Sequence, residues 1–115
     1  MLLIVTKYLI PKGYRGLAVF PFILLKFKED KVNTILINHE KIHLRQQLEF
    51  LIIPFFVWYL TEYLIRVMQY KNTDLAYRNI SFEREAYANE SDLNYLKRRP
   101  FFGFLNYLHK KSLRK

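Results

Sequence analysis

Cysteine is absent from this 115-residue chain, and histidine, glycine and proline are scarce, with 3, 3 and 4 residues respectively. Without cysteine the chain can form no disulfide bond, no thiolate metal site and no thiol nucleophile. A metal ion would have to be bound by histidine, carboxylate or backbone oxygen. Because there are only three histidines, few arrangements of such a site are open to the chain.

Acidic residues are few, and long apolar runs are missing. The chain has 10 Asp and Glu against 19 Lys and Arg, a formal net charge of +9. The strongest apolar stretch, 50–60, falls short of the roughly 20 residues that a membrane-spanning helix needs. The start of the chain lacks the basic region and cleavage site of a signal peptide. We therefore expect a cytoplasmic protein in which 50–60 is a buried core helix or, alternatively, lies at a membrane surface.

The basic excess is concentrated toward the end of the chain, because no acidic residue follows Asp92. A basic tail over 98–115 suits an anionic membrane surface, phosphate or an acidic partner. The same charge also serves simply to keep an apolar protein in solution. No zinc finger or RNA-binding motif is present, so nucleic acid is not an expected partner.

Length and composition indicate a single domain over 1–115. Hydrophobic residues make up 51% of the chain, which suffices for one modest core. We predict an α+β fold, mainly α, with a small N-terminal antiparallel β-hairpin and three to four helices. The predicted parts are a β-hairpin and edge strand (1–28), the helices that carry the site (31–97) and the basic C-terminal tail (98–115).

Two strands and two long helices are predicted in the first part of the chain. Residues 2–10 and 14–28 are the strands, and Pro21 places the second at a sheet edge or at a bulge because proline cannot donate to a ladder. A helix follows with Asp30 as its N-cap, and Pro54 kinks or breaks it. The boundaries predicted further along are Ser81 as N-cap of a helix over 82–97, a break at 98–100 and a short helix over 101–111.

One motif carries chemistry: His39-Glu40-Lys41-Ile42-His43, which is H-E-x-x-H on a predicted helix. Residues four apart share a helix face, so both imidazoles can reach one ion. Neutral imidazole is a good ligand for Zn²⁺. Glu40 lies about 100° around the helix, so it flanks the metal and can accept the proton of a metal-bound water.

Two histidines do not complete a catalytic zinc site, which has three protein ligands and an open position. His109 lies in the basic tail and is the weaker candidate for the third ligand. Glu83 and Glu85 lie on the predicted helix over 82–97 and, being two residues apart, face different ways. Only one of them is expected to reach the metal.

The motif, followed downstream by a helical Glu-x-x-Ala at 83–86, resembles the gluzincin branch of the zincin metallopeptidases. The resemblance implies Glu83 as third ligand, with Glu85 as the fallback. Tyr87 stands where several members have the aspartate that supports a ligand histidine. The stretch 39–47 is also similar to small uncharacterised zincin-like domains in which Gln-Gln follows H-E-x-x-H. In zincins an edge strand ahead of the metal helix pairs with an extended peptide, and residues 16–25 hold that place here.

Several further residues have two interpretations. Tyr87 lies one turn after Glu83 and can donate to a developing oxyanion, or it packs in the core as most aromatic residues do. Tyr77 is a second such donor. Gln46 and Gln47 continue the histidine face, and either form a polar stripe or hydrogen-bond near the site.

These observations predict a zinc-dependent metallohydrolase, specifically a peptidase, acting on a peptide or protein. Glu40 is the expected general base and Zn²⁺ the expected cofactor. The alternative is a catalytically inactive zincin-like protein with a binding or structural role, whose metal would be closed off by a fourth protein ligand such as Glu85 or His109. Either version could attach peripherally to a membrane through 50–60 and the basic tail.

Overall fold

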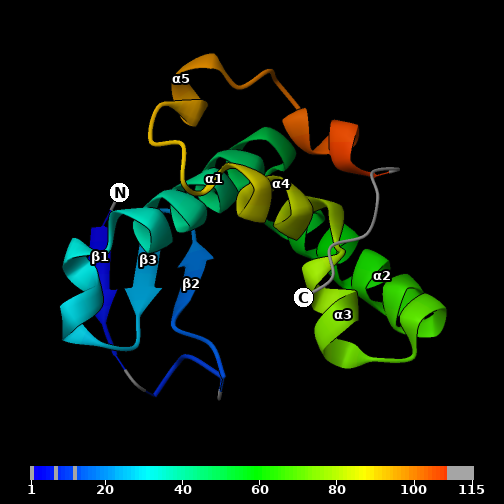
Figure 1. Ribbon diagram of the computed structural model, residues 1–115, viewed down its shortest axis with the longest axis horizontal. Helices are drawn as coiled ribbons and strands as arrows, with labels where there is room; N and C mark the ends of the chain where they lie inside the picture. The colour runs from blue at the N-terminus through cyan, green and yellow to red at the C-terminus, as the bar shows by residue number, and fades with distance from the viewer. Residues whose placement is uncertain (1, 7, 12, 109–115) are drawn as a thin grey trace.

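A computed structural model describes residues 2–6, 8–11 and 13–108 (Figure 1). The fold is α+β and mainly helical, with a small sheet at the N-terminus, as the sequence predicts. The elements are β1 (Leu2–Val5), β2 (Gly16–Val19), β3 (Phe22–Leu25), the 3₁₀ helix η1 (Lys28–Val32), α1 (Thr34–Phe50), α2 (Ile52–Tyr70), α3 (Thr73–Arg78), α4 (Ser81–Asn89), α5 (Tyr95–Arg98) and the 3₁₀ helix η2 (Gly103–Tyr107).

The sheet has the order β1-β3-β2, so β2 is an edge strand. An antiparallel hairpin is present, but it is formed by β2 and β3, both within the predicted second strand, whereas β1 pairs with β3 in parallel. The prediction of one strand over 14–28 is wrong, because the chain turns at 20–21 between β2 and β3. Pro21 lies in that turn, where its missing N–H costs no ladder hydrogen bond. The predicted strand over 2–10 is also shorter, ending at Val5.

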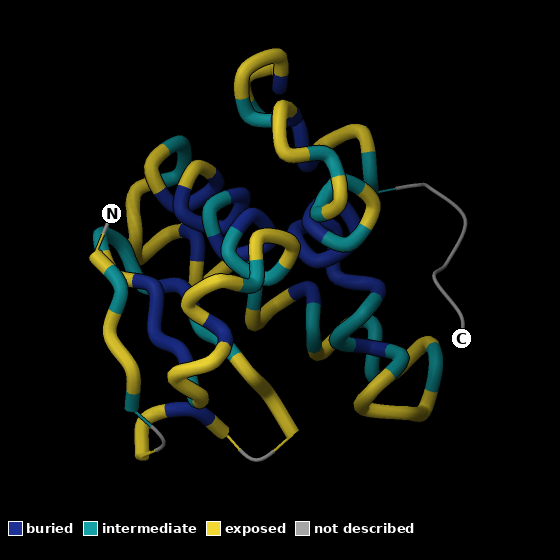
Figure 2. Tube along the Cα trace, turned by 60° about the vertical axis from the view of Figure 1, so that its left-hand side comes forward, coloured by how far each residue is buried: buried dark blue, intermediate teal, exposed yellow. Residues whose placement is uncertain are grey.

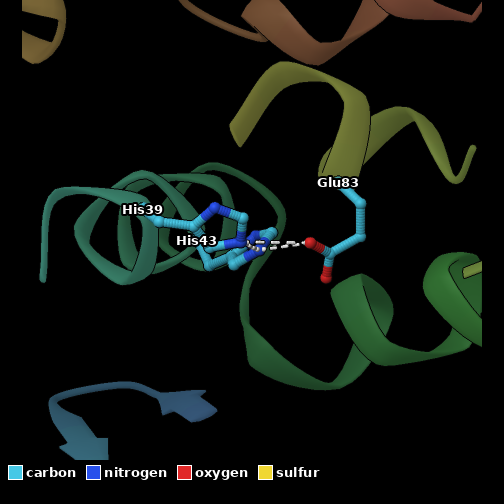
Figure 3. A group of neighbouring side chains, drawn as sticks. All are labelled: His39, His43 and Glu83. Carbon is cyan, nitrogen blue, oxygen red and sulfur yellow. Dashed lines mark hydrogen bonds and ion pairs between the residues drawn. The ribbon is translucent and has the colours of Figure 1, made fainter. Parts of the chain in front are cut away.

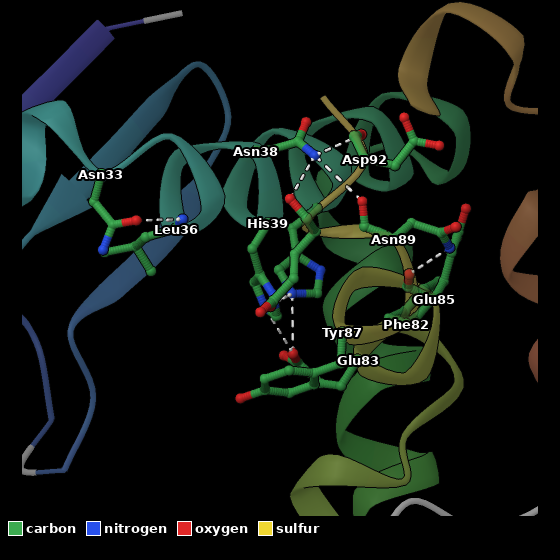
Figure 4. Close-up of polar contacts among 12 residues, drawn as sticks. Asn33, Leu36, Asn38, His39, Phe82, Glu83, Glu85, Tyr87, Asn89 and Asp92 are labelled. Atoms are coloured by element: carbon green, nitrogen blue, oxygen red, sulfur yellow. Dashed lines mark hydrogen bonds and ion pairs between the residues drawn. The ribbon is translucent and has the colours of Figure 1, made fainter. Parts of the chain in front are cut away.

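The long helix α1 begins later than predicted. Its N-cap is Asn33, whose side-chain oxygen accepts a hydrogen bond from the Leu36 N–H (3.1 Å; Figure 4). Asp30, the predicted cap, instead lies in η1 and is buried against Arg15, which donates to it from Nε (3.1 Å). Because the buried Asp30 carboxylate is already paired with the Arg15 guanidinium, it does not cap the helix.

The predicted break between the two long helices falls at Leu51 rather than at Pro54. Leu51 adopts φ 64° and ψ 153°, and the axes of α1 and α2 diverge there by 111°. Pro54 lies in the first turn of α2, where backbone N–H groups have no acceptor within the helix. No single helix in the described part of the chain is long and apolar enough to cross a membrane; α1 and α2 reach that length and composition only as a bent pair.

The predicted helix over 82–97 is divided into α4 and α5 by the connection 90–94. Ser81 is the first residue of α4 rather than its cap, and its N–H and hydroxyl both donate to Glu62 of α2 (2.5 and 2.6 Å). Asn38 of α1 anchors the end of α4 and this connection by donating to three backbone oxygens (Figure 4). Those acceptors are the carbonyls of Asn89, Glu90 and Asp92. The predicted helix over 101–111 is the shorter η2, and 109–111 lie outside the described residues.

The two larger of the three apolar clusters among the described residues flank α1, and the buried segments run through the middle of the molecule (Figure 2). One joins the sheet to α1 and is made by Ala18, Ile23, Leu25 and Leu44. The other joins α2, α4 and η2 and is made by Phe55, Ile80, Phe82 and Phe104. Helix α1 therefore lies between two cores, and its own buried face is largely polar.

Candidate metal centre

Helix α1 buries polar side chains that a core helix normally excludes. They are Asn38, His39, Glu40, His43, Gln46 and Gln47, none more than 6% exposed. A buried polar group without a hydrogen bond costs on the order of 1–3 kcal/mol. The fold can keep this face only because other elements supply partners, and those partners define the site.

The centre of the polar face is a cluster of three side chains, His39 and His43 from α1 and Glu83 from α4 (Figure 3). Glu83 Oε1 lies 3.2 Å from His39 Nε2 and 3.1 Å from His43 Nε2. The two Nε2 atoms are 3.2 Å apart. One atom from each residue therefore forms a nearly equilateral triangle.

This triangle has the dimensions of a metal site. In a tetrahedral zinc site with bonds of about 2.0 Å, two ligand atoms are about 3.3 Å apart. The three observed separations lie close to that value. The set of two imidazoles and one carboxylate is also a donor set that zinc takes in catalytic sites. The residues present therefore fit the ion.

The outer atom of each candidate ligand is held by a hydrogen bond. His39 Nδ1–H donates to Glu90 Oε1 (2.7 Å), and His43 Nδ1–H donates to Gln46 Oε1 (2.8 Å). The Tyr59 hydroxyl of α2 donates to Glu83 Oε2 (2.7 Å). When Nδ1 carries the proton, a neutral imidazole presents the lone pair of Nε2. These contacts therefore aim one donor atom of each ligand at the centre of the cluster.

Glu85, the fallback ligand, does not join the cluster. Its carboxylate is fully buried in an ion pair with Arg99, and it also accepts from Tyr95 Oη (2.6 Å). It accepts a further hydrogen bond from Gln46 Nε2 (2.9 Å). Because the Gln46 amide donates here and to the Phe82 carbonyl (3.1 Å), its oxygen faces His43. Glu85 thus sets the amide orientation on which the His43 tautomer depends.

Glu40 lies beside the cluster and bounds two cavities. One, of about 250 Å³, is lined by Glu40, His43 and Glu83; the other, of about 310 Å³, by Glu40 and His39. Burial raises the pKa of Glu40, and the neighbouring His43 and His39 partly oppose that rise. Gly16 of β2 packs against the carboxylate so closely that a Cβ there would lie 3.3 Å from Oε2.

Strong electrostatic coupling holds the cluster together without a metal. Burial lowers the pKa of His39, but hydrogen bonds to Glu83 and Glu90 more than compensate and raise it to about 10. Burial also opposes ionisation of Glu83, but the two histidines outweigh it and hold the pKa of Glu83 well below its usual range. A metal cation placed here would take over the role of those imidazolium protons.

Tyr87 packs edge-on against the His39 ring (4.6 Å between centroids). Its hydroxyl lies 3.3 Å from the Tyr77 hydroxyl. Tyr77 lines both cavities beside Glu40, whereas Tyr87 lines only the second of them. Burial raises the pKa of Tyr77, so this hydroxyl keeps its proton and remains a donor. Of the two tyrosines, Tyr77 thus has the better access to both cavities.

The sequence analysis missed two residues of the site, Tyr59 and Glu90. Glu90 follows Glu83 by seven positions, two helical turns, so the spacing alone would have placed both carboxylates on one face. It supplies the carboxylate support for His39 that Tyr87 cannot give. Tyr59 gives no such signal, because its place depends on the fold of α2 against α4. Of the two interpretations left open for the glutamines, Gln46 takes the second, because its side chain hydrogen-bonds His43.

In the part of the chain that the structure describes, the cluster has three members and no fourth side-chain ligand. His109, the other histidine, lies outside the described residues. Compared with known proteins, the chain matches no family model, no curated protein and no solved structure.

Proposed function

We propose that this protein is a zinc-dependent metallohydrolase, specifically a peptidase. The observation that carries the proposal is the convergence of three ligand atoms, each on a side chain whose outer atom is already hydrogen-bonded. His39, His43 and Glu83 would hold the ion. Zinc bound there would polarise a carbonyl group and acidify a water molecule.

Glu40 is the proposed general base. Its carboxylate lies beside the ligands and bounds both cavities, so it can reach a water molecule next to the cluster. Burial raises its pKa, which makes this carboxylate a stronger base than a solvent-exposed glutamate. Glu40 would accept the proton of the attacking water and return it to the leaving amine. Tyr77, and Tyr87 behind it, are the proposed hydrogen-bond donors to the substrate oxygen.

The sheet edge supports a peptide as substrate. Lys26 N–H donates to the Arg15 carbonyl (2.9 Å), so by alternation Gly16 and Ala18 direct their backbone groups away from β3. The Ala18 carbonyl already accepts a hydrogen bond from Gln47 (2.8 Å). Gly16, by contrast, lines the cavity beside the cluster. An extended peptide could therefore pair with the free edge of β2.

The cavity of about 250 Å³ indicates which residue of a peptide lies next to the metal. Apart from the ligands and Glu40, its walls are mostly apolar or aromatic. They include Tyr14, Leu17, Phe55, Phe56, Tyr59 and Tyr77. We therefore infer a preference for a bulky apolar side chain beside the scissile bond. We expect the enzyme to act in the cytoplasm.

Hydrolysis of a library of quenched fluorescent peptides by the zinc-loaded protein tests the proposal. The expected result is cleavage beside apolar residues that a chelator abolishes and zinc restores. Glu40→Gln is the matched control, since it keeps the shape of the side chain and removes the base. Cleavage at the native rate by this variant would refute the mechanism. Zinc binding without cleavage of any peptide would favour the inactive zincin-like alternative.

A further inference from the structure

A groove of about 860 Å³ runs along α2, apart from the metal cluster. The residues that line it before Leu60 are all apolar or aromatic, whereas the polar ones all follow Leu60. The apolar set is Phe50, Ile53, Pro54, Val57 and Trp58, and the polar set is Thr61, Glu62, Arg66 and Gln69. Positions 53 and 69 lie about 24 Å apart along the helix. The groove therefore has the size and the apolar walls of a small-molecule site, with one polar end.

The polar end carries an excess of positive charge. Arg66 Nη2 and Arg84 Nη1 both donate to the Leu108 carbonyl, over 3.1 and 3.2 Å. Among the described residues, the only carboxylate paired with either arginine is that of Glu62, which lies 3.2 Å from Arg66 Nη2. Burial lowers the pKa of Arg84, and the positive charge of Arg66 lowers it further. Two guanidinium groups therefore face one carboxylate, which leaves one positive charge without a counterion at this end of the groove.

Arg66 has hydrogen-bonding capacity that an anion could use. Its Nη1 donates to Oε1 of Gln69 (3.0 Å), an exposed side chain that lines the same groove. Its Nε is buried and has no acceptor among the described residues. A carboxylate in place of the Gln69 amide would exchange a neutral acceptor for a charged one, and charge-assisted hydrogen bonds are about twice as strong. The polar end of the groove therefore favours an anion.

We propose that the groove binds one long-chain fatty acid, whose hydrocarbon chain lies against the apolar residues of α2 and whose carboxylate pairs with Arg66. Such a ligand is apolar along its length and carries a single negative charge at one end, so it matches both parts of the groove. A second copy of the chain is the less favourable occupant. Two chains of net charge +9 repel each other, and α2 has no exposed carboxylate that could pair with the arginine.

The single tryptophan of the chain reports on binding directly, because Trp58 lines the groove. Dodecanoate, and an analogue brominated on its chain, are titrated into the full-length protein with EDTA present and below their micelle concentrations. We expect saturable binding of one molecule per chain by calorimetry, with a dissociation constant on the order of 10–100 µM. The brominated analogue should quench Trp58 emission. Dodecyltrimethylammonium, which has the same chain and the opposite charge, should bind about tenfold more weakly or less.

Two exposed residues of α2 form a matched pair of test and control. Val57 (61% exposed) lines the groove, whereas Leu60 (58% exposed) does not. Val57→Glu should weaken dodecanoate binding by about tenfold or more, since it places a carboxylate against the hydrocarbon chain. Leu60→Glu changes the net charge equally and should bind as the native protein does. Arg66→Gln, folded by circular dichroism, should reduce the preference for dodecanoate over dodecyltrimethylammonium by about tenfold.

Four results would overturn the proposal. They are the absence of saturable dodecanoate binding, equally tight binding of dodecyltrimethylammonium, equal losses in Val57→Glu and Leu60→Glu, and self-association of the native protein that Val57→Glu abolishes without dodecanoate binding. The last result would assign the groove to a second copy. The comparison of the two ligands uses native protein, so it decides the preference for an anion even where Arg66→Gln does not fold. Because zinc is absent from these measurements, their outcome does not depend on the proposed peptidase activity.

Discussion

Substitution of Gln46 can separate two roles of this side chain, its support of a metal ligand and its support of the fold. Its side chain is fully buried and makes three hydrogen bonds: to His43 Nδ1 (2.8 Å), Glu85 Oε1 (2.9 Å) and the Phe82 carbonyl (3.1 Å). Gln46→Met keeps the volume and removes all three, so little of its effect should come from a cavity.

The three lost bonds are not equivalent. Glu85 retains Arg99 and Tyr95, so it stays satisfied. The Phe82 carbonyl is a helical acceptor within α4 and keeps its position in that ladder. His43 Nδ1 is the group left without a partner, at a cost of about 1–3 kcal/mol. We therefore expect the free energy of unfolding of the metal-free protein to fall by about 1–3 kcal/mol, one such penalty rather than three.

Zinc affinity should fall as well, by about 10–100-fold, because the His43 ring loses the contact that fixes its tautomer and orientation. Gln47→Met is the matched control. Gln47 is equally buried on the same helix, but its amide bonds Ala18 O (2.8 Å) and Phe20 N (2.7 Å) in the sheet. This variant should lose a similar amount of stability and keep the native zinc affinity.

The assay is competition for zinc with a coloured chelator, at a temperature where both variants are folded by circular dichroism. Stability is measured in parallel by urea unfolding in the presence of EDTA. Equal losses of zinc affinity in Gln46→Met and Gln47→Met would refute the reasoning. So would native affinity in both.

Three further predictions concern charge, packing and protons. Without metal, Glu40→Gln should raise the melting temperature at pH 7, because burial raises the pKa of Glu40 and its ionised form destabilises the fold. The gain in melting temperature should vanish below the usual pKa of glutamate. A lowered melting temperature at pH 7 would contradict this prediction. Gly103→Ala should lower the free energy of unfolding, measured with urea, by about 1–3 kcal/mol, since the added Cβ would lie 2.8 Å from Glu85 Oε2, an atom held by Arg99 and Tyr95. A loss no larger than that of Asn106→Ala, at an exposed position, would contradict this prediction. Zinc binding at pH 7 should release about one to two protons, because the pKa of His39 is about 10 and imidazole binds zinc unprotonated. The release is measured by calorimetry in two buffers that differ in ionisation enthalpy. Binding without proton release would argue against His39 as a ligand.

Much of the site could be predicted because its core is local. His39 and His43 are four residues apart on one helix, so spacing alone brings them together. Glu83 required a resemblance to known metallopeptidases, since no spacing within the chain connects it to α1. The supporting residues differ in the same way: Gln46 continues the histidine face, but Tyr59 reaches Glu83 only through the packing of α2 on α4.

The errors in the fold come from interactions between distant residues. The alternation over 14–28 is typical of one strand, yet the turn at 20–21 is stabilised by Gln47 of α1, which accepts from the Phe20 N–H. Ser81 has the chemistry of a cap, but Glu62 of another helix binds it instead. The break between α1 and α2, by contrast, follows from local sequence: it occurs at Leu51, in the turn before Pro54, which has no N–H to donate to the Phe50 carbonyl.

The central claim, that His39, His43 and Glu83 hold a metal, is tested most directly by elemental analysis of the purified protein after incubation with zinc and gel filtration. Native protein, Glu40→Gln and the exposed control Glu29→Ala should each retain one zinc per chain. His39→Ala and Glu83→Ala, folded by circular dichroism, should retain almost none. Absence of zinc from the native protein, or full occupancy in Glu83→Ala, would contradict the account.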